Sequence, residues 1–252
     1  MPEITIAEER IYYKKWGNIG KRHLVAIHGS GGSHRQWPEN LRTLPHTDVL
    51  LPDLPGHGGS SGGGRDTISG YAGCMTRFIE TLNLDQVILM GHSLGGAIAQ
   101  SIAMNEPGWL KGIILVGTGA RLRVTPVILE GLKSNPKKTF EFILKHLFSP
   151  GTSNEVVDQI RQGFLLTPAG VTLNDFLACD RFDITADVHR IRCPALILSG
   201  EADQLTPVKY GAYLEKAIQG SCHVVLPNAG HMMAIEDPQG FIGAVGAFLK
   251  EL

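Results

Sequence analysis

The chain lacks the long apolar runs and the excess of one charge that mark several large classes of protein. Its most apolar segments, such as VILM at residues 87–90, are far shorter than the roughly 20 residues needed to cross a bilayer. Lys and Arg number 23 against 24 Asp and Glu, so the chain has no basic excess for binding a phosphate backbone. We therefore expect neither a membrane nor a nucleic acid as a partner.

Cysteine is also scarce, and its spacing matches no zinc or redox motif. The four cysteines are Cys74, Cys179, Cys193 and Cys222. They form no C-x-x-C pair and no Cys/His ligand set, so we expect buried free thiols and no bound metal. The opening residues MPEIT include an acid and no apolar core of a secretory signal, which favours a cytoplasmic location.

Short apolar runs alternate with amphipathic segments along most of the 252 residues. This rhythm predicts an α/β fold with a mostly parallel central sheet flanked by helices. An opening hairpin is expected at 4–6 and 10–13, followed by strands at 23–28, 48–51, 86–90, 112–116, 193–199 and 222–226. Helices are expected at 68–82, 94–105, 207–218 and 238–249, the third of them capped by Thr206.

The interval 121–187 breaks this rhythm, because it holds helical patterns such as 140–148 and 155–166 but no convincing strand. Six of the nine phenylalanines fall in it, namely Phe140, Phe142, Phe148, Phe164, Phe176 and Phe182. A crossover between parallel strands needs little more than a dozen residues. We therefore interpret 121–187 as a helical cap inserted after the strand that ends near Val116, on a core of 1–120 and 188–252. Extra structural packing is the alternative.

The pattern G-x-S-x-G occurs twice, at 91–95 and at 58–62. Ser93 follows an apolar strand and opens a helix rich in small residues, as a nucleophile at a strained strand-to-helix turn requires. Ser60 lies in a glycine-rich loop with no apolar run on either side, which is typical of a flexible turn. Ser93 is therefore the candidate nucleophile.

A serine hydroxyl attacks poorly unless a base takes its proton and an acid orients that base. His231 comes just after the last expected strand, and Asp203 follows the strand before it. Both positions lie at the carboxyl edge of a parallel sheet, where active sites form. The order Ser, Asp, His is the one expected for such a fold. Glu201 and Glu236 are the nearest alternative acids.

The loop HGSGG at 28–32 follows another strand and can present a backbone N–H group to Ser93. We expect the N–H groups of Ser30 and Leu94 to form an oxyanion hole. His28 is interpreted as a brace for this loop, and His92 as a residue that packs beside its strand. No P-loop and no G-x-G-x-x-G in the required frame is present, so no nucleotide cofactor is expected.

Five motifs follow one another along the chain in the order found in one known family. They are HGSGG at 28–32, DLPGHG at 53–58, GHSLGG at 91–96, GEADQLTP at 200–207 and AGHMMAIEDP at 229–238. Together they resemble the α/β-hydrolase superfamily over nearly the whole chain. The resemblance is to its compact, cofactor-free bacterial carboxylesterases and to related lactone and C–C hydrolases. It implies an α/β-hydrolase fold and a triad of Ser93, His231 and Asp203. The expected reaction is hydrolysis of a small to medium apolar ester through an acyl-enzyme, without metal or cofactor.

Two departures narrow the chemistry. Similar hydrolases of epoxides and haloalkanes carry Asp where this chain has Ser93. Dienone C–C hydrolases usually carry Trp directly after the catalytic histidine, whereas Met232 follows His231 here. Ester hydrolysis is thus the leading interpretation. C–C or enol-lactone hydrolysis by the same triad stays open, as does a slow-turnover ligand sensor.

Overall fold

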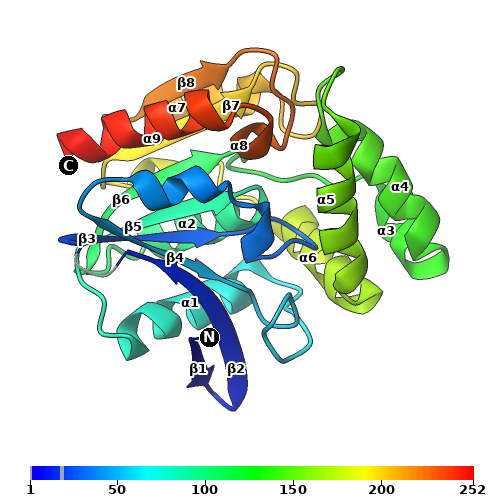
Figure 1. Cartoon of the computed structure of the whole chain (residues 1–252), viewed down its shortest axis with the longest axis horizontal. Helices are drawn as coiled ribbons and strands as arrows, with labels where there is room; N and C mark the ends of the chain where they lie inside the picture. The colour runs from blue at the N-terminus through cyan, green and yellow to red at the C-terminus, as the bar shows by residue number, and fades with distance from the viewer. Residues whose placement is uncertain (1, 18–19) are drawn as a thin grey trace.

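A computed structural model describes residues 2–17 and 20–252; Met1, Asn18 and Ile19, which belong to the expected core segment 1–120, lie outside the described residues. The described residues form one eight-stranded sheet in the order β1-β2-β4-β3-β5-β6-β7-β8 (Figure 1). The strands are β1 (Glu3–Ile6), β2 (Glu9–Trp16), β3 (Arg22–Ile27), β4 (Thr47–Pro52), β5 (Val87–His92), β6 (Leu110–Val116), β7 (Ala195–Gly200) and β8 (Cys222–Leu226).

The strands from β4 to β8 in this order run parallel, while β2 pairs antiparallel with both β1 and β4. β4, β5 and β7 are buried at every position. Continuous apolar strands of this kind occur where helices cover both faces of a parallel sheet. The predicted mostly parallel α/β sheet is confirmed.

Helices cover both faces of the sheet. Those of the core are α1 (Ile68–Thr81), α2 (Leu94–Ala103), α7 (Val208–Ala217), α8 (Met233–Glu236) and α9 (Pro238–Glu251), with short 3-10 turns η1 (His34–Gln36), η2 (Glu39–Thr43) and η3 (Val188–Arg190). Phe78 of α1, Ile98 of α2 and Leu214 of α7 belong to one apolar cluster. Leu41 of η2 and Phe241 of α9 belong to a second cluster, built on residues of the opposite face of the strands.

One predicted helix cap is wrong. α7 begins at Val208 with Pro207 at the N-cap position, so Thr206 does not cap it. Instead, the Thr206 hydroxyl donates to the carboxylate of Asp203 at 2.8 Å. The side chain that looked like a helix signal therefore belongs to the candidate site.

Four further helices lie between β6 and β7, and we call them the inserted helices. They are α3 (Pro126–Ser134), α4 (Pro136–Leu147), α5 (Asn154–Leu166) and α6 (Ala169–Arg181). In Figure 1 they lie together at one end of the sheet, in green and yellow-green. Their apolar cluster includes Phe140, Ile143 and Phe164. The sequence patterns predicted α4 and α5 but neither α3 nor α6. In α6, buried Thr172 and Asp175 interrupt the apolar stripe.

The four cysteines are free, but they are not all buried. Cys74 and Cys179 are buried, Cys193 is half-buried and Cys222 is exposed. Cys222 opens β8, the last strand of the sheet, where one edge has no neighbouring strand. The expectation of a buried thiol is therefore wrong at Cys222. Among the described residues, no helix has the length and apolar character needed to cross a membrane.

Candidate active site

Ser93 lies in the turn between β5 and α2 with φ of +52° and ψ of −112°, a strained conformation for a residue with a side chain. The strain is imposed by very close backbone packing. A Cβ atom on Gly91 would lie 2.1 Å from the carbonyl oxygen of Gly95. A Cβ atom on Gly95 would lie 2.2 Å from the carbonyl oxygen of Ile27 on the adjacent strand. The two outer glycines of the G-x-S-x-G pattern are thus required by space.

His231 and Asp203 form a buried pair at the ends of β8 and β7. His231 Nδ1 lies 2.8 Å from Asp203 Oδ2, and both side chains are almost inaccessible. The other carboxylate oxygen accepts the backbone N–H groups of Leu205 and Thr206 at 2.8 and 2.9 Å. Burial by itself raises the pKa of Asp203, but the His231 ring and these donors outweigh burial and hold that pKa well below its usual range. Asp203 is therefore ionised beside His231.

A chamber of about 210 Å³ brings the predicted residues together. Ser93, His231 and Ser30 all line it, although they come from three different strand ends. Asp203 lies behind His231 and is not part of the lining. Leu94 is fully buried at the first position of α2, where a backbone N–H group has no carbonyl partner within the helix.

Three of the N–H groups in the loop 28–32 have acceptors within the protein. Gly29 N–H donates to Gln36 Oε1, Gly31 N–H to Asp175 Oδ2 and Gly32 N–H to the carbonyl oxygen of Gly29. Among the described residues, the N–H group of Ser30 has no acceptor. Ser30 is thus the residue of this loop that can donate to a ligand in the chamber.

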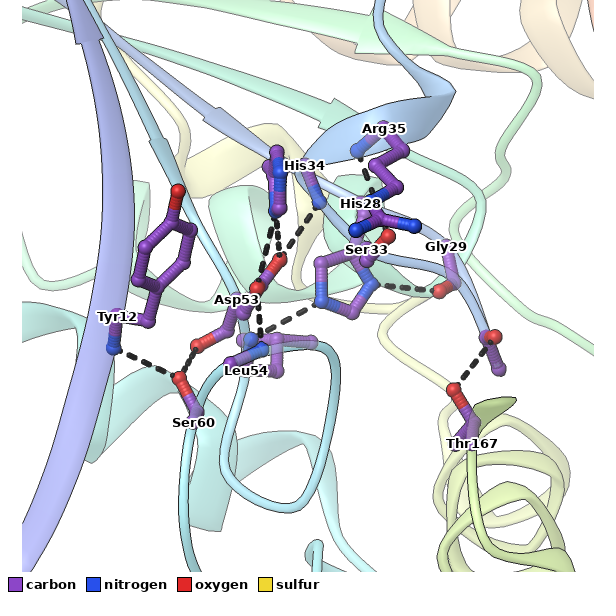
Figure 2. A network of polar contacts seen from close by, with 12 residues as sticks. Tyr12, His28, Gly29, Ser33, His34, Arg35, Asp53, Leu54, Ser60 and Thr167 are labelled. Carbon is purple, nitrogen blue, oxygen red and sulfur yellow. Dashed lines mark hydrogen bonds and ion pairs between the residues drawn. The ribbon is translucent and has the colours of Figure 1, made fainter. Parts of the chain in front are cut away.

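His28 supports the loop 28–32 through hydrogen bonds, as predicted. Its Nε2 accepts the Leu54 N–H at 3.0 Å, and its Nδ1–H donates to the carbonyl oxygen of Gly29 at 2.8 Å (Figure 2). Burial and the nearby His57 ring lower the pKa of His28 to about 4, so the ring is neutral at neutral pH. A neutral ring is required here, since one nitrogen accepts and the other donates.

His92 does more than pack beside its strand. Its Nε2–H donates to the backbone carbonyl of His231 at 3.0 Å, and its Nδ1 accepts from Gln36 Nε2 at 3.1 Å. Burial and the His231 ring lower the pKa of His92 to about 3. Gln36 in turn accepts the Gly29 N–H. A continuous chain of hydrogen bonds thus joins the His231 loop to the loop that carries Ser30.

The competing residues are engaged elsewhere. The Ser60 hydroxyl donates to the carbonyl oxygen of Asp53 at 2.7 Å and accepts the Tyr12 N–H at 2.9 Å (Figure 2). Glu201 accepts the N–H of Asn228. Glu236 accepts the N–H groups of Ser149 and Gly230, among other donors. Each of these side chains supports a loop instead of facing Ser93.

Among the described residues, no cluster of three or more His, Cys, Asp or Glu side chains has the geometry to hold a metal ion.

A family model described as "Alpha/beta hydrolase family" matches residues 24–244, which is most of the chain. The chain belongs to the alpha/beta hydrolase family. It is 33% identical to the protein in "Structure of a thermophilic esterase", with a TM-score of 0.87 and coverage of 99% of this chain and 97% of that one. This match and the sheet order agree with the predicted fold.

Two curated proteins match the chain at lower identity. Pimeloyl-[acyl-carrier protein] methyl ester esterase of Pectobacterium atrosepticum is 28% identical over 95% of this chain and 98% of that protein. 2-Succinyl-6-hydroxy-2,4-cyclohexadiene-1-carboxylate synthase of Escherichia coli is 28% identical over 94% of this chain and 97% of that protein. The two names describe different reactions, so sequence likeness alone does not choose between them.

The packing at Ser93 leads to a first prediction. Gly95→Ala should lower the free energy of unfolding by about 3 kcal/mol, because the new methyl group overlaps the Ile27 carbonyl oxygen. Gly243→Ala in α9 is the control, since no atom lies within 4 Å of its Cβ position and alanine favours a helix. Urea denaturation measures both variants. Equal stability of the two would contradict the close packing.

Proposed function

We propose that this member of the family is a serine hydrolase that cleaves carboxylic esters. Ser93 is the nucleophile, His231 the general base and Asp203 the acid that orients the imidazole. One observation carries the proposal: His231, hydrogen-bonded to the buried and ionised Asp203, lines one small chamber together with a serine in a strained turn. The esterase that is 33% identical to this chain supports the same chemistry.

In the proposed reaction, Ser93 Oγ attacks the acyl carbon and its proton passes to His231. Asp203 stabilises the resulting imidazolium and keeps Nδ1 protonated. The negative charge on the acyl oxygen is stabilised by the N–H groups of Ser30 and Leu94, and each such donor contributes about 3 to 4 kcal/mol. The alcohol leaves with the proton from His231, and water activated by His231 then releases the acid.

We assign the interval 121–187 the role of a cap over the chamber. Ile128, Ile143, Phe164 and Phe176 of the inserted helices line the cavity with apolar surface. Exclusion of water makes the oxyanion donors more effective. A volume of about 210 Å³ lies below the usual range of small-molecule pockets, which favours a small to medium apolar acyl or alcohol group.

The alternative is C–C or enol-lactone chemistry by the same three residues. A relative named as a synthase and not as an esterase matches 94% of this chain, so a reaction other than simple ester hydrolysis stays open. Met232, which follows His231 where dienone C–C hydrolases usually carry Trp, lines the chamber. A panel of p-nitrophenyl esters, lactones and dienones separates the two: a kcat/KM for a dienone or enol-lactone far above that for every simple ester favours the alternative.

The nucleophile is tested by Ser93→Ala, which should lower kcat on p-nitrophenyl acetate at least about 10⁴-fold, because triad members act as one unit. Ser60→Ala is the matched control, since it removes the serine of the second G-x-S-x-G segment. It should retain most of the activity. Steady-state kinetics on both variants measure this, and the reverse ranking would disprove the assignment of Ser93.

The pH profile gives a second test. Asp203 stays ionised and His28 and His92 stay neutral above about pH 5, because their pKa values are all lowered. As the pH falls, a proton on His231 removes the base, so kcat/KM should decline along one limb of unit slope. A rate that is flat from about pH 5 to about pH 9 would argue against a histidine base.

The cap is tested by comparing two phenylalanines of the inserted helices. Phe176 lines the chamber, whereas Phe142 is exposed and does not. Phe176→Ala should raise kcat/KM for longer acyl chains relative to acetate, because it enlarges the cavity, and Phe142→Ala should leave this ratio unchanged. Rates on acetate, butyrate and octanoate esters measure it. A common factor across all chain lengths in Phe176→Ala would show that the side chain does not select substrates.

A further inference from the structure

Gly31, which follows the proposed oxyanion donor Ser30, is held by the inserted helices and not by the core alone. Its N–H donates to Asp175 Oδ2 at 2.8 Å, and its carbonyl oxygen accepts the Thr167 hydroxyl at 3.0 Å. A Cβ atom on Gly31 would lie 2.7 Å from the ring of Phe164. Its φ is +65°, a left-handed conformation that favours glycine. Both backbone polar groups of Gly31 therefore have partners in the inserted segment.

Asp175 is fixed in turn by the core. It is fully buried on α6, and its carboxylate accepts from His57 Nε2 at 2.8 Å and from the Tyr71 hydroxyl. His57 Nδ1 lies 3.0 Å from the carbonyl oxygen of Pro55, so both ring nitrogens face acceptors and both carry a proton. Burial lowers the pKa of His57, but the Asp175 carboxylate outweighs burial and raises it overall. Asp175 is thus paired with a buried, protonated His57.

The hydrogen bonds around Gly31 close a tight turn that contains Ser30. The Gly32 N–H donates to the carbonyl oxygen of Gly29, which places Ser30 and Gly31 at the centre of the turn. The bond from the Gly31 N–H to Asp175 therefore fixes the peptide plane that follows Ser30, at the centre of the turn that carries the Ser30 N–H. An oxyanion donor has to lie at about 2.7 to 3.1 Å from the developing charge to be effective.

We propose that Asp175 and Thr167 are positioning residues of the oxyanion hole: by holding Gly31, the inserted helices aim the Ser30 N–H into the chamber. The inference rests on the proposed function, in which Ser30 is a donor. Packing alone does not require this arrangement, because a buried ion pair is a poor source of stability compared with apolar side chains of similar size. On this proposal, the oxyanion hole is complete only when the inserted helices are docked on the core.

Two buried threonines provide a matched comparison. Thr167 bonds to Gly31, whereas the Thr172 hydroxyl, on a side chain that also packs near Gly31, has no hydrogen-bond partner among the described residues. Thr167→Val should lower kcat on p-nitrophenyl acetate about tenfold, with KM nearly unchanged, because a small misplacement of a catalytic donor is costly. Thr172→Val should leave kcat unchanged. Circular dichroism and active-site titration confirm that folded protein is compared.

An aryl trifluoromethyl ketone reads the oxyanion hole directly. Ser93 Oγ adds to the ketone carbon, its proton passes to His231, and the former carbonyl oxygen becomes an oxyanion. The inhibition constant of this adduct should weaken by the same factor as kcat/KM in Thr167→Val, and stay unchanged in Thr172→Val. A role in folding alone would lower the fraction of active protein without changing the constant.

Asp175→Asn extends the test to the carboxylate, with Asp180→Asn on the same helix as its control. Asp180 accepts the N–H of Val124, whereas the described side-chain partners of the Gly31 backbone are Asp175 and Thr167. Asp175→Asn should weaken the adduct more than Thr167→Val does, because it also removes the charge that holds His57. Equal inhibition constants in Thr167→Val, Thr172→Val and the unaltered protein would overturn the positioning role alone. A lack of any adduct in the unaltered protein would overturn the proposed function and the positioning role with it.

Discussion

A carboxylate that is removed from water has to be surrounded by hydrogen-bond donors, and this requirement organises the loops around the candidate active site. Asp203 accepts from two backbone N–H groups, the Thr206 hydroxyl and His231. Desolvating an ion costs several kcal/mol unless such partners are supplied. The donors come from a loop after β7 and another after β8. The pair can therefore form only once these two strands are in register, which couples the chemistry to the fold.

Asp53, in the loop after β4, and Asp175, on α6, are surrounded by donors in the same way. Asp53 accepts from the backbone and ring of His34 (Figure 2). It also accepts the Gly59 N–H. Asp175 accepts from Gly31, His57 and Tyr71. Each carboxylate thus ties together loops that are distant in the sequence. The result is a set of loops whose backbone directions are fixed before any ligand enters the chamber.

The sequence predicts the elements that depend on local pattern and fails where contacts join distant segments. The strands around Ser93 were found because buried parallel strands are continuous apolar runs. The context of G-x-S-x-G distinguishes Ser93 from Ser60, because an apolar strand precedes Ser93 and a segment rich in small residues follows it, whereas Ser60 has no apolar run on either side. Gln36 and Asp175 were missed, since their partners lie 56 and 144 residues away and leave no periodicity. Thr206 was seen but given the wrong role, because Thr-Pro is also a helix-start signal.

The insertion also contacts the loop of His231. The backbone N–H groups of His231 and Met232 both donate to the carbonyl oxygen of Leu147, at the end of α4. Glu236 links the segment just after α4 to the same loop through Ser149. The inserted helices therefore support the backbone on two sides of the chamber, one beside His231 and one beside Ser30.

This double attachment limits how the protein can be redesigned. Exchanging the whole segment between β6 and β7 for that of another family member would remove Thr167 and Asp175 together with the chamber wall. Side chains that line the cavity without holding a loop, such as Ile128 and Ile143, are the safer positions for reshaping it. A chimera that imports α3 and most of α4 but keeps α5 and α6 would change the wall and preserve the scaffold. When a segment of the insertion is exchanged, its ends should thus be chosen so that the hydrogen bonds to the two loops are kept, and not simply at the ends of the insertion in the sequence.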